Sequence, residues 1–406
     1  MDVGRRRAER FPVGATATLE QLEADPHALL ARLREHEPVS WLPALEGWLV
    51  TRRDLAMQVM REPGTFTVDD ERFSTGQVVG PSMLTRDGAE HRRHRDPFAR
   101  PFRRDAVHAR FTQLVDEETE RLIDEMQRAG GAELRRSLAG PLAVAVVTRA
   151  LGLQDVDVAS VLGWYDRIVA AVTDITAGRP LGADGRDAYS ALSTALGPAL
   201  GRAPAESLLA SAAGEAGGLE RGVVISNAAV LLFGGIETTE GMIANAVWHL
   251  LSHPGQLALV RESPGLLANA VEESLRLEPA AAIVDRYATT DVELAGAPIL
   301  CGDLVRVSIA GANRDPAVFA DPDHFDVQRS NAHRHVAFAH GPHACIAMHL
   351  ARLEAVTAAQ RLLRRLPDLR LDPASPTVPR GLVFRKPPEL RVLWTPESTS
   401  PATRSA

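Results

Sequence analysis

The sequence predicts a mainly α protein with small β-sheets. Most apolar residues recur at the three- and four-residue spacing of helices, and the longest such run covers residues 222–252. Short segments rich in Val, Ile and Trp, bounded by turn residues, are typical of brief strands. With 45% hydrophobic and 24% charged residues, the chain can build a core large enough to enclose a cofactor.

The 406 residues contain no Ser/Gly-rich linker or charge block, so we expect one domain over residues 1–394. The Ser/Thr/Pro-rich segment 395–406 is expected to be disordered. The formal net charge of -7 gives no support to general nucleic-acid binding. The chain starts without an apolar signal segment, and the apolar run 228–233 is too short to cross a bilayer. We therefore expect a cytoplasmic monomer that binds no membrane.

The N-terminal part predicts a helix over residues 19–36, a hairpin with strands near 39–41 and 47–51, and a helix over 53–61. Residues 65–88 lose periodicity and form either a loop that covers a ligand or a packed surface loop. Their apolar residues are candidate ligand contacts: Val79, Met83 and Leu84.

His91 and Arg95 are four residues apart in a basic segment, so a helix places them on one face. The letters alone leave open a solvated basic helix or a pair that binds a buried anion. Helices over 107–130, 138–153 and 156–176 read as scaffold. Residues 178–222 are rich in Ala and Gly and contain breakers, which suits a mobile lid or a plain flexible connection: Pro180, Pro198 and Pro204.

The long helix over residues 222–252 carries the adjacent glycines Gly234 and Gly235, which cost roughly 1 kcal/mol each against alanine. Glycine permits a ligand to approach the helix backbone closely. The Glu237-Thr238 pair that follows could deliver protons, or Thr238 could bond to its own helical turn at a kink. Two apolar residues just before the pair are candidate substrate contacts: Val230 and Phe233.

A helix over residues 266–277 contains Glu273 and Arg276 at ion-pair spacing, and Arg276 offers a planar fork to a third partner. Strands follow near 292–294 and 305–309, and a late hairpin is predicted over 381–394. Further candidate ligand contacts in these regions are apolar: Ile283, Val284 and Val383.

Only two cysteines are present, far apart in sequence, so a disulfide framework is not expected. Cys301 follows a strand end and reads as structural. Cys345 follows the Gly341-Pro342 turn and opens a helical segment, where unpaired N–H groups and the helix dipole favour a thiolate. Such a thiolate could attack a substrate, bind zinc or ligate haem iron, and a buried structural cysteine is the remaining alternative. Zinc is disfavoured because no CxxC or HExxH spacing occurs.

This stretch resembles the haem-binding loop of the cytochrome P450 family, in which a Phe, a Gly, a basic residue, the Cys and a small residue recur at fixed offsets. The matching residues are Phe338, Gly341, His343, Cys345 and Ala347. The resemblance implies that Cys345 is the axial ligand of haem b, that Phe338 covers the thiolate and that His343 reaches a propionate. Ala339 and Ala347 stand where the family most often has Gly.

Other signals match the same family in the right order. Gly234, Gly235, Glu237 and Thr238 match its oxygen-binding groove, which implies that Thr238 bonds the bound dioxygen and that Glu237 connects to solvent. His91, Arg95 and Arg286 match propionate-binding residues. Glu273, Arg276 and Arg329 match a structural lock behind the haem.

The resemblance implies the cytochrome P450 fold, with haem between the long central helix and the Cys loop. It implies a monooxygenase that takes two electrons from NAD(P)H through a ferredoxin or flavodoxin partner and splits dioxygen. The expected reaction is hydroxylation of a small or medium organic molecule, such as a natural-product intermediate. Oxidative coupling or ring closure, and a haem redox or gas sensor without turnover, are the alternatives. The arginines near His91 form a basic patch that would attract an acidic electron donor if the thiolate side is exposed: Arg92, Arg93, Arg100, Arg103 and Arg104.

Overall fold

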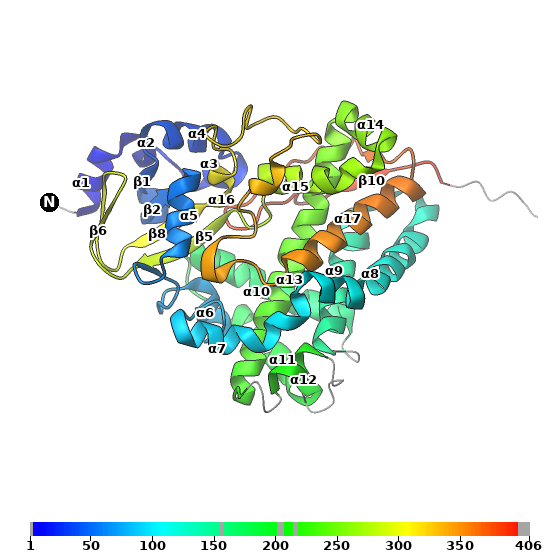
Figure 1. Cartoon of the computed structure of the whole chain (residues 1–406), viewed down its shortest axis with the longest axis horizontal. Coiled ribbons are helices and arrows are strands. Elements are labelled where there is room, and N and C mark those ends of the chain that lie inside the picture. Colours follow the sequence, from blue (N-terminus) through cyan, green and yellow to red (C-terminus); the bar gives the residue numbers. More distant parts are fainter. Residues whose placement is uncertain (1–2, 154–156, 201–206, 214–217, 397–406) are drawn as a thin grey trace, which may run out of the picture.

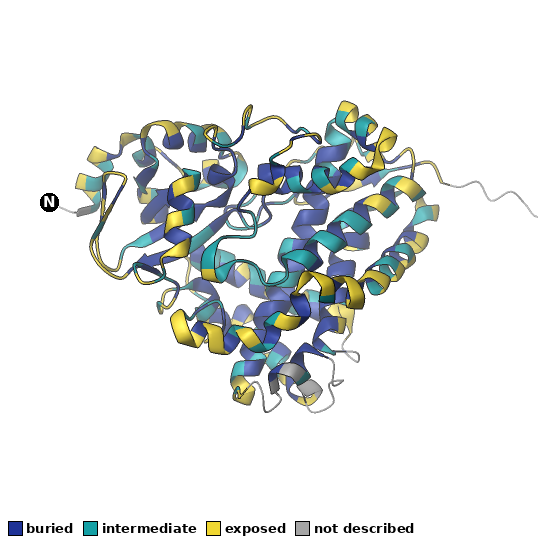
Figure 2. Ribbon diagram, viewed as in Figure 1, coloured by how far each residue is buried: buried dark blue, intermediate teal, exposed yellow. Residues whose placement is uncertain are grey.

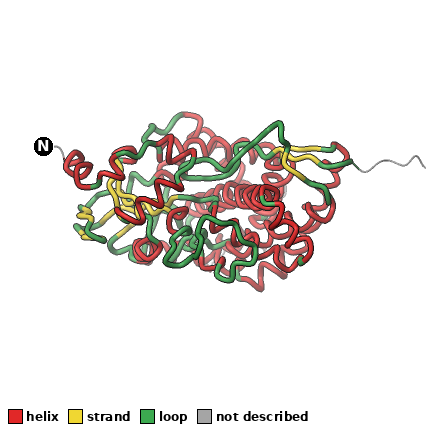
Figure 3. Tube along the Cα trace, turned by 90° about the horizontal axis from the view of Figure 1, so that it is seen from above, coloured by secondary structure: helices red, strands yellow, loops and turns green. Residues whose placement is uncertain are grey.

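The computed structural model describes residues 3–153, 157–200, 207–213 and 218–396 and confirms a mainly α protein with small sheets (Figure 1). Of the tail predicted to be disordered, residues 397–406 lie outside the described ranges, as does Pro204 of the predicted lid. Seen from above in Figure 3, most strands gather near the N-terminal end, and a smaller group lies at the opposite end. The helices fill the region between the two groups.

The main sheet has five strands in the order β1-β2-β8-β5-β3. These strands are β1 (Val39–Leu42), β2 (Gly47–Val50), β8 (Leu304–Ser308), β5 (Ile283–Ala288) and β3 (Phe66–Thr67). The predicted hairpin is confirmed, because β2 pairs antiparallel with β1 and its other edge runs parallel to β8. A separate hairpin joins β6 (Val292–Leu294) to β7 (Ala297–Ile299). Four consecutive residues of β5, 283–286, line the cavity described below.

Six helices surround the sheet or lead from it. They are α1 (Val3–Arg10), α2 (Pro12–Ala15), α3 (Leu19–Ala24), α4 (His27–His36), α5 (Arg53–Arg61) and α6 (Ser74–Val79). The single helix predicted over residues 19–36 is wrong. Asp25 is extended and Pro26 lacks an N–H donor, so the chain breaks between α3 and α4. The segment 65–88, predicted to be irregular, contains β3 and α6.

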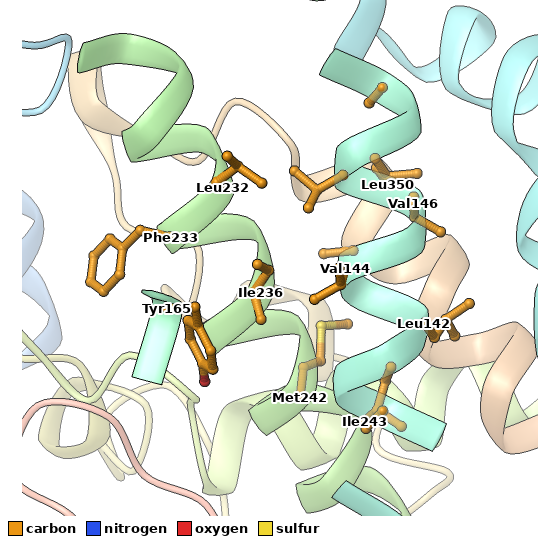
Figure 4. Packing of buried hydrophobic residues seen from close by; sticks show 14 of the residues in the cluster. Leu142, Val144, Val146, Tyr165, Leu232, Phe233, Ile236, Met242, Ile243 and Leu350 are labelled. Carbon is orange, nitrogen blue, oxygen red and sulfur yellow. The ribbon is translucent and has the colours of Figure 1, made fainter. Parts of the chain in front are cut away.

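The remaining helices form the larger part of the molecule. They are α7 (Gly88–Ala99), α8 (Arg104–Met126), α9 (Gly140–Leu151), α10 (Val158–Thr176), α11 (Ala183–Leu200), α12 (Leu208–Ala213), α13 (Arg221–Ser252), α14 (Pro254–Glu262), α15 (Leu267–Leu277), α16 (Ile309–Ala312) and α17 (Met348–Arg365). The central helix α13 packs against α9, α15 and α17. Figure 4 shows this packing, with Val144 of α9 pointing toward α13 and Leu142 and Val146 pointing to the other side of α9.

The helix α13 is long and apolar enough to cross a membrane by length and composition, the one such helix in the described part of the chain. Most of that apolar stretch is buried inside the protein, and Figure 2 shows it enclosed by other helices. The length and apolar composition of α13 are therefore explained by its place in the core of the fold.

One prediction in the C-terminal half is wrong. Instead of the late hairpin over 381–394, β10 (Arg391–Leu393) pairs with β4 (Gly131–Glu133) and β9 (Arg370–Leu371). The helix α14, which was not predicted, begins at Pro254, because proline at the first helical position loses no hydrogen bond. Cys301 lies exposed in the turn before β8. In the predicted lid over residues 178–222, Pro198 was expected to break the chain into weak segments, but it lies inside α11.

The loop that carries Cys345 is pressed against the end of α5. Gly341 has φ +75°, and a Cβ there would lie 2.6 Å from the carbonyl oxygen of Met60, so no other residue fits without displacing backbone. Ala339, two residues earlier, also has a left-handed conformation with φ 58°. The sequence therefore supplies a glycine at one of the two left-handed positions of the loop and an alanine at the other.

Candidate active site

A mostly apolar cavity of about 310 Å³ lies between α13 and the Cys345 loop and extends to α6, α10 and β5. It collects most of the residues that the sequence singled out. The predicted site residues that line it are Met83, Leu84, Arg95, Val230, Phe233, Gly234, Gly235, Thr238, Ile283, Val284, Arg286, Phe338, His343, Cys345, Ala347 and Val383. Val79 does not line it, because its side chain is buried in the hydrophobic core. His91, Glu237 and Gly341 also lie behind the lining.

Cys345 faces this cavity from a loop, three residues before α17 begins, so the expectation that it starts a helix is wrong. Burial raises the pKa of the Cys345 thiol, although a hydrogen bond from the Ala347 N–H and the charges of Arg95 and Arg352 act in the opposite direction. The loop holds the cysteine in place, because the Cys345 N–H donates to the Phe338 carbonyl at 2.8 Å. Protein groups alone therefore do not favour the thiolate here, whereas a metal cation would.

Two arginines approach the cavity near Cys345. Arg95 on α7 donates to the Ala344 carbonyl at 2.6 Å, and Arg286 on β5 donates to the Asp285 carbonyl at 2.7 Å. Burial lowers the pKa of Arg286 to about 10, and Arg286 has only a 4% exposed surface. Neither arginine has an ion pair with a carboxylate among the described residues. One half-buried cation, Arg95, and one buried cation, Arg286, fit a ligand with negative charges.

Two histidines complete the same end of the cavity. His343 Nε2 lies 2.8 Å from Asp87 Oδ1, and the rings of His91 and His343 are 4.2 Å apart. Burial would raise the pKa of Asp87, but hydrogen bonds from His343, Thr67 and Val68 outweigh it and lower this pKa to about 2. Burial, together with the charges of His343 and Arg95, lowers the pKa of His91 to about 4.

The unpaired ring nitrogens test whether a haem fits. His91 Nε2 and His343 Nδ1 are buried without a hydrogen-bond partner among the described residues. Buried polar atoms are normally hydrogen-bonded, so these two nitrogens and the two arginines fit a ligand that carries hydrogen-bond acceptors. A haem presents two carboxylates and an iron that binds thiolate. The residues present therefore fit it, with Cys345 facing the same space.

On the other wall, α13 brings Thr238 and Gly234 to the cavity. The Thr238 hydroxyl donates to the Gly234 carbonyl at 2.5 Å, one helical turn earlier. A Cβ at Gly234 would meet no atom within 4 Å, which leaves open space beside the helix backbone. Because the hydroxyl proton is used within the helix, the Thr238 oxygen is free to accept a hydrogen bond from the cavity.

Glu237 points away from that space, and the expected link to solvent is not formed directly. Its carboxylate, 2% exposed, lies 2.8 Å from Lys386 Nζ and accepts a hydrogen bond from the Tyr165 hydroxyl. The fully buried Glu240 joins the group through the Tyr165 hydroxyl at 3.2 Å and Lys386 Nζ at 3.5 Å, and it also pairs with Arg135 at 2.6 Å. Burial and the neighbouring Glu237 raise the pKa of Tyr165 well above its ordinary value. Figure 4 shows Tyr165 lying against α13 near Ile236.

Lys386 is the only lysine among the 406 residues, and its side chain is 13% exposed. It takes part in the Arg380–Lys386 β-bridge in the C-terminal part of the chain. Sequence reasoning missed it because nothing in the local letters ties residue 386 to residue 237. Its ammonium group contacts the Glu237 carboxylate directly.

The residues predicted to form a lock lie on α15 and in the segment after it. Arg276 donates to both oxygens of Glu273 at 2.7 and 2.8 Å, and Arg329 donates to Glu273 at 2.8 Å. Arg276 has no exposed surface and also donates to three backbone carbonyls. The fork of Arg276 is therefore fully used in holding the chain behind the cavity.

Glu354 is a second residue that the sequence reasoning missed. It lies on α17 behind Cys345, lines the cavity and has one carboxyl oxygen buried without a partner. Burial raises the pKa of Glu354 well above its ordinary value, which favours the neutral carboxyl. A signal was present, because Glu354 follows Leu350 and Ala351 at helical spacing on the buried face.

Comparisons with known proteins agree with this geometry. Residues 264–392 match the family described as Cytochrome P450. The chain is 36% identical over 403 residues to the cytochrome P450 monooxygenase PikC of Streptomyces venezuelae, with 92% of this chain and 91% of that protein covered. It is 33% identical to the 20-oxo-5-O-mycaminosyltylactone 23-monooxygenase of Streptomyces fradiae, with 90% and 87% covered.

Solved structures show the same architecture. The crystal structure of CalO2 is similar with a TM-score of 0.83 and 29% identity, covering 94% of this chain and 100% of that one. The structure of P450BioI in complex with hexadec-9Z-enoic acid ligated acyl carrier protein is similar with a TM-score of 0.82 and 28% identity, covering 93% and 100%.

Proposed function

The chain belongs to the cytochrome P450 family, and from this premise we propose that it hydroxylates a partly apolar natural-product intermediate with electrons from a separate redox protein. It is an enzyme of the monooxygenase class, and its family uses cysteine-ligated haem and dioxygen. The observation that carries the proposal is one cavity that holds the Cys345 sulfur, the buried arginines and the Thr238 hydroxyl together.

Cys345 would bind the iron of haem b, and Arg95, Arg286, His91 and His343 would bind its carboxylates. When bound, the haem supplies the iron centre at which dioxygen is activated. The two arginines place positive charge near Cys345, and their burial strengthens any charge-assisted hydrogen bond to the carboxylates. The buried cations thus account for both the position and the charge of the ligand.

Protons reach the cavity through groups on α13. Thr238, with its own proton bonded to Gly234, would accept a hydrogen bond from a water molecule and hold that water in place. Glu237 is one residue away and is held by Lys386 and Tyr165, a group that can exchange protons with solvent. Most of the cavity wall is apolar and excludes bulk water, so Thr238 is a defined point at which a proton can be held.

The relatives support the natural-product substrate class. Three of them are named 20-oxo-5-O-mycaminosyltylactone 23-monooxygenase, nocardicin C N-oxygenase and pentalenic acid synthase. Valines, leucines and phenylalanines are frequent in the apolar part of the cavity wall, and they suit a hydrocarbon skeleton. Ring closure or oxidative coupling on the same skeleton would use the same residues.

The electron donor would dock on a basic surface beside Cys345, which we call the arginine face: Arg92, Arg93, Arg100, Arg103 and Arg104. All five are exposed, and Arg93 alone among them has an ion pair, with Glu90, in the described part of the chain. Arg104 lies near His349 on α17 and Arg95 contacts the Cys345 loop, so the face borders the cysteine side. An acidic ferredoxin or flavodoxin, supplied with electrons from NAD(P)H in the cytoplasm, fits this charge.

The decisive experiment is the carbon monoxide spectrum of the reduced, haem-loaded protein. We expect the absorption band typical of thiolate-ligated haem, and we expect Cys345→Ser to lose it. Cys301→Ser is the matched control and should keep the band, because Cys301 is exposed in a distant turn. A band that survives in Cys345→Ser would reject Cys345 as the ligand.

A second experiment separates turnover from sensing. With reductase, ferredoxin and a substrate, NADPH should be consumed and oxidised product should form, which a sensor would not do. Thr238→Ala should keep the carbon monoxide band but divert reducing equivalents to peroxide, because the oxygen is no longer held. Tightly coupled product formation in this variant would reject the role of Thr238.

A further inference from the structure

Asp285 and Arg306 form a buried charged pair in the main sheet. They stand directly opposite each other on β5 and β8, with Arg306 Nε 3.4 Å from Asp285 Oδ1. Their side chains are 12% and 5% exposed. The formal charges cancel, so the pair is compatible with its apolar surroundings as long as both members are present.

The pair leaves polar atoms without partners. Asp285 Oδ1 and Arg306 Nε and Nη1 are buried and make no hydrogen bond within the described residues. The 3.4 Å contact between them is an ion pair, but it does not have hydrogen-bond geometry. Since buried polar atoms are normally paired, these three atoms indicate a missing polar partner.

The pair lies where a ligand can reach it. Asp285 lines the cavity, and Arg306 Nη2 donates at 2.8 Å to the carbonyl of Thr176, the last residue of α10, which also lines the cavity. The cation at a helix C-terminus is favourable, so this bond fixes Arg306 behind Asp285. The fixed guanidinium in turn holds the carboxylate at the cavity wall.

Two hydroxyls from α6 line the same cavity. Ser74 and Thr75 are 8% and 6% exposed, line the cavity and have no side-chain hydrogen bond to the described residues. The helix α6 packs against α10, whose last residue holds Arg306. Three separate elements thus present polar atoms to a cavity whose other walls, such as Val230, Phe233 and Val383, are apolar.

We propose that Asp285, Arg306, Ser74 and Thr75 form a subsite for a neutral, hydroxyl-bearing part of the substrate. This inference rests on the proposed function, because it assigns how the substrate of that same cavity is held. A hydroxyl donates to the Asp285 carboxylate and accepts from Ser74 or Thr75, which no ether or hydrocarbon can do. A fully charged group would lose its hydration against a pair without net charge.

Isothermal titration calorimetry on the haem-loaded protein tests the subsite with octan-1-ol and 1-methoxyheptane. These isomers have the same size, but only the alcohol can donate a hydrogen bond. We expect octan-1-ol to bind about tenfold more tightly, the factor of one well-made hydrogen bond. Octanoate and octyltrimethylammonium should bind more weakly than the alcohol. Equal affinities for the two isomers, or a tighter-binding ion, would overturn the proposal.

The double variant Asp285→Leu/Arg306→Met removes both charges together, so neither is left unpaired in the core. It should lose the preference for octan-1-ol while its affinity for 1-methoxyheptane stays within about twofold. Val230→Ala, on an apolar wall, is the control and should weaken both probes equally. If the double variant does not fold, Ser74→Ala/Thr75→Val should reduce the preference about threefold. A preference that persists in these variants would place the hydroxyl elsewhere.

Calorimetry requires binding but not turnover. Loss of the expected preference in a protein that still forms product would reject the subsite alone. A preserved preference in a protein that forms no product with any partner would reject the proposed reaction while leaving the subsite in place.

Discussion

Ala339 shows how one residue carries strain beside the cysteine. It has φ 58°, a conformation that costs an L-residue roughly 1–2 kcal/mol, while glycine adopts it freely. Part of this gain is offset by the greater freedom of glycine in the unfolded chain. We expect Ala339→Gly to raise the free energy of unfolding by about 0.5–1 kcal/mol, measured by denaturant titration of the haem-loaded protein.

The control for that substitution is Ala337→Gly, two residues earlier and outside the left-handed positions. It should destabilise the protein by a similar amount, because there glycine only adds freedom to the unfolded chain. Equal losses in both variants would show that Ala339 is not strained.

Glu354 makes stability depend on pH. Burial raises the pKa of its carboxyl in the folded protein, whereas the unfolded chain ionises it near the ordinary value. Between these two pKa values the folded state binds one more proton, so stability falls as pH rises, by up to about 1.4 kcal/mol per pH unit. Glu354→Gln should remove this slope and be the more stable protein at pH 8, measured by urea unfolding at several pH values.

Glu262→Gln, at the exposed end of α14, is the matched control and should follow the wild-type slope. If Glu354→Gln kept the same slope as wild type between pH 5 and pH 8, Glu354 would be ionised in the folded protein. That outcome would require a partner that its surroundings do not supply.

At the scale of elements, the central helix α13 is tied to a C-terminal segment by charge. Glu237 and Glu240 share Lys386, which lies 2.8 and 3.5 Å from them. Lys386→Met would leave two buried carboxylates with Arg135 as their remaining cation. Because an unpaired buried charge typically costs 3–5 kcal/mol, we expect a loss of about that size, measured by thermal unfolding.

Arg380→Met is the control, since Arg380 is exposed and pairs with residue 386 only through the backbone. It should change the free energy of unfolding by less than about 0.5 kcal/mol. Similar melting temperatures for the two variants would show that Lys386 contributes no more than a surface charge.

The elements that sequence reasoning placed well were those decided by local pattern. Helical spacing found α5, α13 and α15, and the offsets around Cys345 and Thr238 brought the cavity residues together. Two errors involved proline, which can either break a helix or start one. Pro26 breaks the helix predicted over residues 19–36, and Pro254 starts α14, which was not predicted. The pairing of β10 with β4 joins residues more than 250 apart, and no local letter encodes it.

The missed site residues share one cause. Asp285, Arg306 and Lys386 acquire their roles from partners in other elements, so their own neighbours in sequence carry no signal. Arg306 alternates with Val305 and Val307 in β8, a pattern that predicts a solvent-facing side chain, so the local pattern did not indicate that Arg306 is buried.

At the scale of the whole molecule, charge is unevenly distributed. The net charge is -7, yet the arginine face carries exposed cations beside the cysteine side of the cavity. An acidic electron donor would be oriented by this difference, and salt would weaken the effect. We expect Arg100→Glu/Arg104→Glu to slow electron transfer from ferredoxin about tenfold at low ionic strength, measured by stopped-flow reduction.

The slowing should shrink in high salt, because the effect acts on encounter and not on the haem. Arg5→Glu/Arg6→Glu on α1 makes the same change in net charge elsewhere and should leave the rate nearly unaffected. Equal slowing by both pairs would attribute the effect to net charge and reject the arginine face as the docking surface.

The single lysine has a practical consequence for spectroscopy. Selective ¹⁵N and ¹³C labelling of lysine would place one labelled side chain in the entire protein, and that side chain forms an ion pair with Glu237. Its resonance needs no assignment, and its chemical shift would follow the ion pair directly when ligands or redox proteins are added. The proposed proton entry at Glu237 can thus be followed through a single labelled side chain.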